Sequence, residues 1–300
     1  MLQNNLNNIY DWALQNNMAF NNKKFQAIRF HSLFTSLDLG KYTDSAGIDI
    51  EFHKHVKDLG IFISEDLSFD EHIRYITAKG KQMAGWILRV FDSRSPFLMK
   101  ILLKQLIIPR IEYECVLWSP TSLDQIKHLE SVQKFFTSKI SFNNNNKMDY
   151  WERLQDLKLF SVERRRERYI ILYTWKVIHN MYPNPGLQLN NIFPNSHTQN
   201  PANGISVTSF NDRTGMKIGH IPTKQRNLKA LSVLNKCWDL YNCLPSQLRR
   251  PISADEEPNC PQFKTELDKW LSTIPDQPSI LGRHRSSKSN SIIHQKDYRR

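Results

Sequence analysis

Apolar residues recur at helical spacing through most of the chain. The longest such stripe covers residues 73–91 and follows a polar turn in which Ser68 and Glu71 have the spacing of a capping box. Ahead of that turn, residues 56–63 form a short apolar run rich in β-branched and aromatic side chains, which predicts a strand. Gly60 lies inside this run, where a glycine usually marks a bulge or the close approach of another backbone.

The same periodicity predicts helices on both sides of this segment. Their ranges are 1–15, 95–108, 122–140, 149–157, 162–182 and 263–271. Ser95 and Pro96 supply an N-cap followed by proline at the first helical position, and Pro109 predicts a break. A second short strand is predicted near residues 25–30, after an asparagine-rich turn.

Composition narrows the classes of function. The chain has 300 residues, of which 40% are hydrophobic and 23% charged, as in ordinary globular proteins. A net charge of +12 and a pI of about 9.5 favour a polyanionic partner, either nucleic acid or an acidic membrane surface. The longest apolar run, residues 101–108, is interrupted by Lys104 and is far too short to cross a bilayer. The first residues lack the pattern of a signal peptide, so we expect no membrane insertion.

The four cysteines are too few and too scattered for a disulfide framework. Cys237 and Cys243 are separated by five residues with no histidine nearby downstream, which is a weak pattern for zinc. We therefore expect buried, reduced thiols, no bound metal, and a nuclear or cytoplasmic location.

Residues 57–73, KDLGIFISEDLSFDEHI, closely resemble the segment that closes the palm and opens the thumb in reverse transcriptases of non-LTR retrotransposons. The matching positions are Leu59, Gly60, Ile61, Phe62, Ile63, Leu67, Phe69, His72 and Ile73. In that family the strand is the primer grip, which holds the 3′ end of the growing strand. The resemblance implies that Leu59, Gly60 and Ile61 contact the primer end.

Two other segments carry the same resemblance. The palm motif of the family is matched by Asn21, Lys24, Ile28 and Phe30, which implies that Lys24 lies near the phosphates of the incoming nucleotide. The alternative for Lys24 is a solvated lysine in a turn. The string PRIEYECVLWSP, residues 109–120, resembles part of the family's thumb, and its interpretation is structural: Tyr113 and Trp118 pack.

The catalytic carboxylates of the family are missing from these residues. Such polymerases use two metal ions held by an Asp-Asp pair, and no Asp-Asp dipeptide occurs in the chain. The resemblance places that pair just upstream of the first predicted helix. We therefore expect the chain to bind no cofactor and to be inactive alone, whereas the intact polymerase would use Mg²⁺.

Basic residues outside the apolar stripes are expected to bind nucleic acid. Arg74, Lys79, Lys81 and Lys134 would contact phosphates of the primer–template duplex. Arg164 and Arg165 belong to a basic cluster in the first turns of the helix predicted at 162–182, where the helix dipole is already positive. Either neighbouring acids pair with this cluster, or part of it contacts phosphate. The neighbouring acids are Glu152, Asp156, Glu163 and Glu167.

The resemblance implies an α+β, predominantly helical chain, with small antiparallel strands at the palm edge followed by a helical thumb bundle and a helical C-terminal region. The implied divisions are the end of the palm (1–64), the thumb (65–142), a C-terminal region (143–275) with an irregular stretch near 186–227, and a basic disordered tail (276–300). The expected partners are an RNA–DNA or DNA primer–template duplex and the remainder of the polymerase, with no membrane. Two alternatives stay open: a stand-alone basic nucleic-acid-binding protein from a decayed element, and a helical protein-interaction module.

Overall fold

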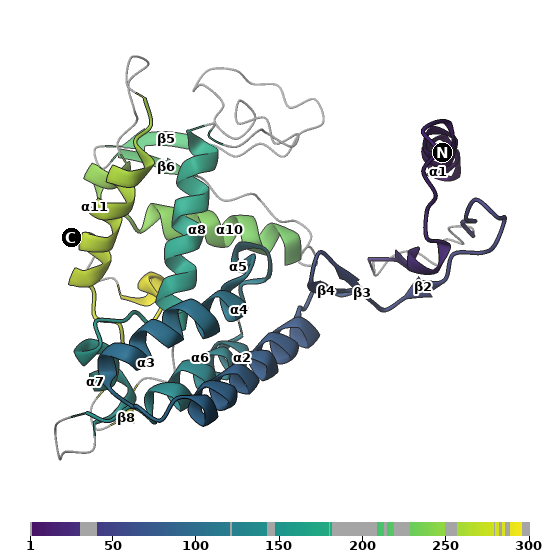
Figure 1. The fold of residues 1–300 in the computed structure, drawn as a ribbon. Coiled ribbons are helices and arrows are strands. Elements are labelled where there is room, and N and C mark those ends of the chain that lie inside the picture. The colour runs from purple at the N-terminus through teal and green to yellow at the C-terminus, as the bar shows by residue number, and fades with distance from the viewer. Residues whose placement is uncertain are drawn as a thin grey trace. The chain divides into compact units, whose positions relative to one another are not determined.

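The computed structural model shows a mostly helical chain with a few short strands (Figure 1). It describes residues 2–30, 41–120, 122–142, 148–179, 181, 209–212, 215–218, 229–249, 257–278, 280–281, 284–285 and 289–295. The chain divides into two compact units, Met1–His72 and Ile73–Arg300, called here unit 1 and unit 2. The predicted predominantly helical α+β class is therefore confirmed.

Unit 1 contains one helix and two small sheets. Its elements are α1 (Leu2–Gln15), the 3₁₀-helix η1 (Asn22–Lys24), β1 (Ala27–Ile28), β2 (Phe52–His53), β3 (His55–Asp58) and β4 (Ile61–Ser64). Strands β3 and β4 pair antiparallel, as predicted for the small strands of this region, whereas β1 and β2 pair parallel, which differs from the prediction.

The run at residues 56–63 is a hairpin, so the prediction of a single strand was wrong. Leu59 and Gly60 form a two-residue turn between β3 and β4, with φ angles of 44° and 91°. Positive φ at both central positions is the pattern of a type I′ turn, which follows the natural twist of the paired strands. The sequence hides this turn because leucine seldom adopts positive φ and because the apolar run continues through it.

Unit 2 is built from helices, with two small hairpins. Its helical segments are α2 (Asp70–Val90, which begins in unit 1), α3 (Pro96–Leu102), the π-helix η2 (Leu103–Ile107), α4 (Ile108–Glu112), α5 (Cys115–Trp118), α6 (Leu123–Thr137), α7 (Tyr150–Asp156), α8 (Val162–Ile178), α10 (Lys229–Asn242), η3 (Ser246–Arg249), α11 (Cys260–Thr273) and η4 (Ile292–His294). The hairpins pair β5 (Ser209–Asp212) with β6 (Gly215–Ile218), and β7 (Ile280–Leu281) with β8 (His284–Arg285). Of the stretch predicted to be irregular near 186–227, β5 and β6 are described and the remainder lies outside the described residues.

The break predicted at Pro109 is wrong, because the helical backbone continues through this residue. The π-helix η2 leads from α3 into α4, and Pro109 occupies the first turn of α4. Proline is tolerated there because its missing N–H would have no partner within the helix.

Helix α2 packs against α4 and α6 at Gly80. A Cβ atom placed on Gly80 would lie 2.8 Å from Cγ2 of Ile111 and 3.0 Å from Cγ1 of Val132. These distances are too short for a side chain at this position, so glycine permits the close approach of the three helices. The apolar face of α2 is buried against these helices, so the charged side chains on its other side point toward solvent.

A second apolar core lies among α8, α10 and α11. Trp175 stacks on Phe263 with ring centroids 4.6 Å apart and planes 10° apart. Ile171, Leu240 and Leu267 are fully buried in the same cluster. Since α6 and α8 also pack together within unit 2, the boundary predicted near residue 142 does not separate two compact units.

The C-terminal segment 289–295 is ordered, so the predicted disordered tail is wrong for these residues. Asn290 and Ser291 are buried. The Asn290 side chain donates to Ser161 Oγ at 2.9 Å, and the Ile292 amide donates to Glu167 Oε2 at 3.2 Å. Buried polar groups on α8 require hydrogen-bond partners, and this segment supplies them.

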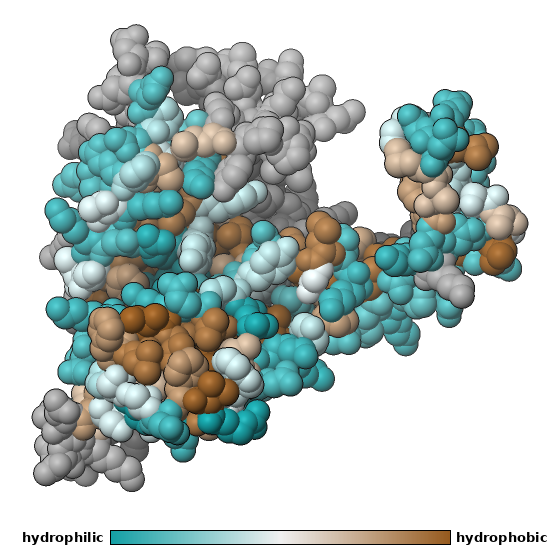
Figure 2. All heavy atoms as spheres, viewed as in Figure 1, coloured by the Kyte–Doolittle hydropathy of each residue, from teal (hydrophilic) through white to brown (hydrophobic). Residues whose placement is uncertain are grey.

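Apolar side chains also reach the surface of unit 2. In Figure 2 brown side chains gather over α3, where Phe97 and Ile101 are exposed. Among the described helices, none combines the length and apolarity that crossing a bilayer requires.

Candidate nucleic-acid interface

The basic residues predicted on α2 and α6 are exposed. Arg74, Lys79, Lys81 and Lys134 all lie on the solvent side of their helices. They point outward because the opposite sides carry the core: Ile76 and Ile87 on α2, and Val132 and Phe136 on α6, are buried. These four residues and His128 are called here the basic face.

The two helices contribute to a single positive surface. Partial desolvation lowers the pKa of His128 on α6, and the positive charges of Lys81 and Arg74 on α2 lower it further. This coupling requires the three side chains to lie near one another. His128 thus belongs to the same surface.

The basic face keeps its positive charge in the part of the chain that the structure describes. Within the described residues, Arg74, Lys79, Lys81 and Lys134 form no ion pair within 4.0 Å. Lys79 Nζ lies 3.4 Å from Gln82 Oε1 and 5.8 Å from the centre of the Tyr75 ring, both of which are uncharged partners. Positive charge at this face therefore stays available to an anion.

The hairpin of unit 1 presents Leu59 at its tip. The Leu59 side chain is 84% exposed, whereas Ile61 is buried. Of the three residues predicted to contact the primer, Ile61 therefore anchors the hairpin through its side chain, and Leu59 and Gly60 form the exposed turn. Lys57, which the prediction did not include, lies on the neighbouring strand with Nζ 5.1 Å from the centre of the Phe62 ring.

His72 connects the hairpin to the start of α2. The Phe62 amide donates to His72 Nδ1 at 3.4 Å, and burial lowers the pKa of His72 to about 4. A neutral imidazole is required for Nδ1 to accept this hydrogen bond. His72 matched the polymerase family by sequence, and its role here is structural.

Lys24 is exposed at the end of η1. An aromatic cluster of Tyr10, Phe20 and Phe25 lies next to it, with ring centroids 5.5–5.6 Å apart. The cluster fixes the turn that carries Lys24. The predicted position of Lys24 near the phosphates of a nucleotide stays a prediction.

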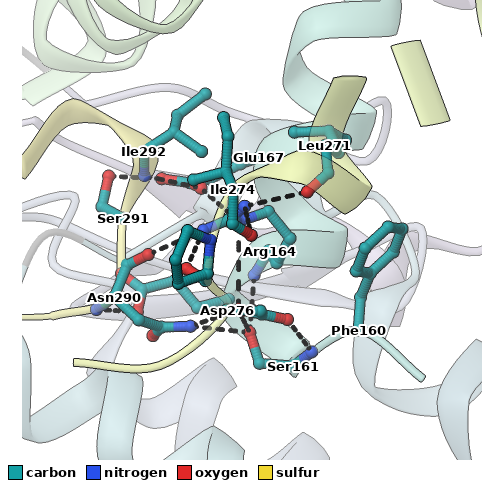
Figure 3. Close-up of polar contacts among 12 residues, drawn as sticks. Phe160, Ser161, Arg164, Glu167, Leu271, Ile274, Asp276, Asn290, Ser291 and Ile292 are labelled. Carbon is teal, nitrogen blue, oxygen red and sulfur yellow. Dashed lines mark hydrogen bonds and ion pairs between the residues drawn. The ribbon is translucent and has the colours of Figure 1, made fainter. Parts of the chain in front are cut away.

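Arg164 cannot contact a phosphate, so this part of the prediction was wrong. Its side chain has 0% exposure, and Figure 3 shows it enclosed by polar groups. Its guanidinium donates to the carbonyl oxygens of Ile274, Pro275 and Asn290 at 3.2–3.4 Å. Its Nε lies 3.6 Å from Glu167 Oε2. Arg164 therefore joins α8 to the segments that follow α11.

Arg165 is held in an ion pair. Its Nε lies 2.5 Å from Glu112 Oε1 and its Nη2 lies 2.8 Å from Glu112 Oε2, a bidentate arrangement with 22% of the Arg165 side chain exposed. Arg168 is similarly paired with Asp268. We predicted neighbouring acids as the partners of this cluster, but Arg165 and Arg168 pair with acids of α4 and α11.

The N-terminus of α8 is stabilised by an acid that the sequence did not reveal. The carboxylate of Glu130 on α6 accepts from the amides of Val162 at 3.1 Å and Glu163 at 3.2 Å. Negative charge at this end complements the helix dipole. Burial raises the pKa of Glu130 to about 7.

The four cysteines are free and buried, as predicted. Burial raises the pKa of Cys115 to about 12 and that of Cys237 to about 11. Among the described residues, no group of three or more His, Cys, Asp or Glu side chains is arranged to hold a metal ion.

Comparison with known proteins gives one distant similarity. The chain is similar to an uncharacterized protein of Caenorhabditis elegans, with 28% identity over 127 residues. The match covers 42% of this chain and 62% of the worm protein, so the chain spans less than two thirds of the relative. No family model and no solved structure matches the chain.

Proposed function

We propose that this chain grips a primer–template duplex through the basic face, as the C-terminal part of a non-LTR retrotransposon reverse transcriptase. The observation that carries the proposal is the exposed, unneutralised positive surface shared by α2 and α6. Surfaces of this kind bind the phosphate backbone, independently of base sequence. Nucleotide joining with Mg²⁺ is left to the remainder of the polymerase, because the chain carries no Asp-Asp pair.

The hairpin tip supports a role in contacting the primer end. An exposed leucine with positive φ costs free energy in the folded state, of the order of 1–2 kcal/mol. Asparagine or aspartate would fit the turn better. Leu59 at this position suggests that the apolar side chain is needed for contact with a ligand.

The surface of unit 1 supports a partner protein, which the proposal identifies as the rest of the polymerase. On α1, Ile9, Trp12 and Leu14 are exposed. Large apolar groups at neighbouring exposed positions commonly mark a protein interface.

The test is binding of a labelled RNA–DNA hybrid duplex by the purified full chain, measured by fluorescence anisotropy at low salt. The double variant Arg74→Gln/Lys81→Gln removes two charges from the basic face and should weaken binding for all duplex sequences alike. The matched control Arg110→Gln/Lys269→Gln removes two charges from exposed positions on α4 and α11 and should leave duplex affinity nearly unchanged.

The outcomes separate the proposal from its alternatives. Absence of duplex binding at low salt would favour the helical protein-interaction module. Equal loss in both double variants would show that net charge, rather than the basic face, determines binding. Primer extension by this chain with Mg²⁺ or Mn²⁺ would contradict the proposal that the chain binds the duplex but does not join nucleotides.

A further inference from the structure

A large pocket lies among α4, α5 and α8, and none of the residues that line it belongs to the basic face. Its volume is about 900 Å³, near the upper end of the roughly 300–1,000 Å³ typical of ligand sites. Residues of α10 and α11 complete its wall through Cys237 and Lys264.

One face of α8 lines the pocket. Its lining residues recur every three to four positions from Arg165 to Lys176, through Tyr169 and Tyr173. This spacing places them on one face of the helix. The eleven steps from residue 165 to residue 176, at about 1.5 Å each, give a wall of roughly 16 Å.

Three tyrosines line this pocket with their rings partly open to solvent. Tyr113 is 52%, Tyr169 38% and Tyr173 37% exposed. The guanidinium of Arg168 lies 6.0 Å from the centre of the Tyr169 ring. Exposed aromatic rings beside basic groups are the platform on which proteins stack unpaired bases.

The pocket is also positively charged. Its wall includes basic Lys104, Arg165, Arg168, Lys176 and Lys264 and acidic Glu112 and Glu114. Arg165 pairs with Glu112 and Arg168 with Asp268, and the seven charged lining residues together with Asp268 carry a formal charge of 5 − 3 = +2. Burial lowers the pKa of Lys104, and the nearby charges of Lys100 and Arg165 lower it further, as expected where positive groups gather.

The positive wall continues into a neighbouring pocket. This second pocket, of about 300 Å³, shares Lys104, Arg165, Arg168 and Tyr169 with the first and adds Lys158. Because they share these residues, the two pockets adjoin, and together they are called here the path.

We propose that this path binds a single-stranded segment of nucleic acid, with Tyr113, Tyr169 and Tyr173 stacking on bases and Lys104 and Lys264 contacting phosphates. The bases of a duplex are already stacked on one another and cannot stack on the tyrosine rings. The site should therefore prefer unpaired strands. The inference extends the proposed function, since both assign nucleic acid as the ligand, but it concerns a different surface and a different form of the ligand.

The test compares binding of a labelled oligothymidine and of a hybrid duplex by the full chain. The double variant Tyr113→Leu/Tyr173→Leu should weaken oligothymidine binding about tenfold or more, as expected for the loss of base stacking. It should leave duplex binding unchanged. The matched variant Tyr113→Phe/Tyr173→Phe keeps both rings and should retain oligothymidine affinity. Thermal melts by circular dichroism establish that each variant is folded.

A second readout does not depend on substitution. Photo-crosslinking of a 5-iodouracil oligonucleotide to the unaltered chain should place the adduct on one of the three tyrosines. Crosslinks elsewhere, or equal oligothymidine affinity in the leucine and phenylalanine variants, would overturn the inference. If the duplex binds with the basic face and oligothymidine does not bind, this inference fails alone; if neither ligand binds, the proposed function fails as well.

Discussion

The two units differ in how far they bury their apolar side chains. Unit 2 buries a continuous cluster from α8, α10 and α11, including Ile171 and Leu240 at 0% exposure. In unit 1, α1 buries only Tyr10 and Ala13 and leaves Leu2 and Trp12 exposed. Unit 2 thus has an internal core, whereas much of the apolar surface of α1 in unit 1 is exposed.

The units also differ in how they bury ionisable groups. Unit 2 encloses the charged pair Arg164 and Glu167, with hydrogen bonds around both (Figure 3). Unit 1 encloses the imidazole of His72, which accepts an amide hydrogen bond in its neutral form. Buried charges specify one arrangement of segments but make a fold sensitive to the loss of a partner. Unit 2 should therefore respond more strongly to single substitutions.

The largest effect is expected from Arg164→Met. The substitution leaves four carbonyl oxygens without the guanidinium that donates to them, and it removes the positive charge 3.6 Å from the buried Glu167 carboxylate. We expect a loss of about 3–5 kcal/mol in the free energy of unfolding, measured by urea denaturation. The control Arg110→Met alters an exposed arginine of α4 and should change stability by about 0.5 kcal/mol or less. Equal effects of the two variants would contradict the role given to the buried pair.

The pH dependence of unit 2 should follow Glu167. Burial, with a further contribution from Glu163, raises the pKa of Glu167 from 4.5 to about 7. Between these values the folded state holds more protons than the unfolded state, so stability falls as pH rises from about 4.5 to 7. A shift of this size corresponds to about 3 kcal/mol.

The variant Glu167→Gln isolates this contribution in denaturation curves across that range. It should flatten the decline in stability, because glutamine does not titrate. Glu130 remains in both proteins, so its own raised pKa does not affect the comparison. An unchanged slope in the variant would exclude Glu167 as the source.

Unit 1 should show the opposite sign at His72. Burial, with a further contribution from Lys57, lowers its pKa from 6.5 to about 4. The unfolded state then holds more protons between these values, so the contribution of His72 is complete above about pH 6.5 and is lost as pH falls toward 4. NMR titration of the imidazole should give a midpoint near 4; a midpoint near 6.5 would show that the His72–Phe62 contact does not persist in solution.

A smaller effect is expected where α2 packs in unit 2. Gly80→Ala places a methyl group 2.8 Å from Ile111 and should destabilise the chain by about 1–3 kcal/mol, less the gain in helix propensity. Gly85→Ala lies in the same helix with nothing within 4 Å and should stabilise it by up to about 1 kcal/mol. Thermal melts of the two variants should shift in opposite directions, and shifts of the same sign would contradict the close packing.

The smallest change in stability is expected at the hairpin tip of unit 1. Leu59→Asn relieves the positive-φ strain and should stabilise the hairpin by about 1 kcal/mol while weakening binding of the hybrid duplex. Lys158→Asn relieves the same strain in unit 2 and should leave duplex binding unchanged. A Leu59→Asn variant that binds the duplex normally would remove Leu59 from the interface.

Periodicity and capping signals predicted most of the fold. Helices α7, α8 and α11 were predicted, with errors at their ends, because their apolar stripes and terminal residues agree. The turn at Leu59 was missed because its conformation departs from the preference of leucine. The order of residues 289–295 was missed because serine-rich, basic composition resembles a solvated tail, and nothing in it reveals a distant buried acid.

The candidate site was predictable where exposure follows from helix periodicity. Arg74, Lys81 and Lys134 fall opposite apolar stripes, and the structure leaves them exposed. Arg164 has a similar local pattern, but its carbonyl partners lie more than one hundred residues away in sequence. Burial of a charge depends on such distant partners, which one sequence does not disclose.

The salt dependence of hybrid-duplex binding by the full chain shows whether the basic face holds the duplex. We expect the slope of log affinity against log salt to become shallower by about 3–4 when Arg74, Lys79, Lys81 and Lys134 are all replaced by glutamine. Each of these side chains would release about one counterion when it contacts a phosphate. An identical slope in the original chain and the fourfold variant would contradict the assignment of the basic face as the duplex-binding surface.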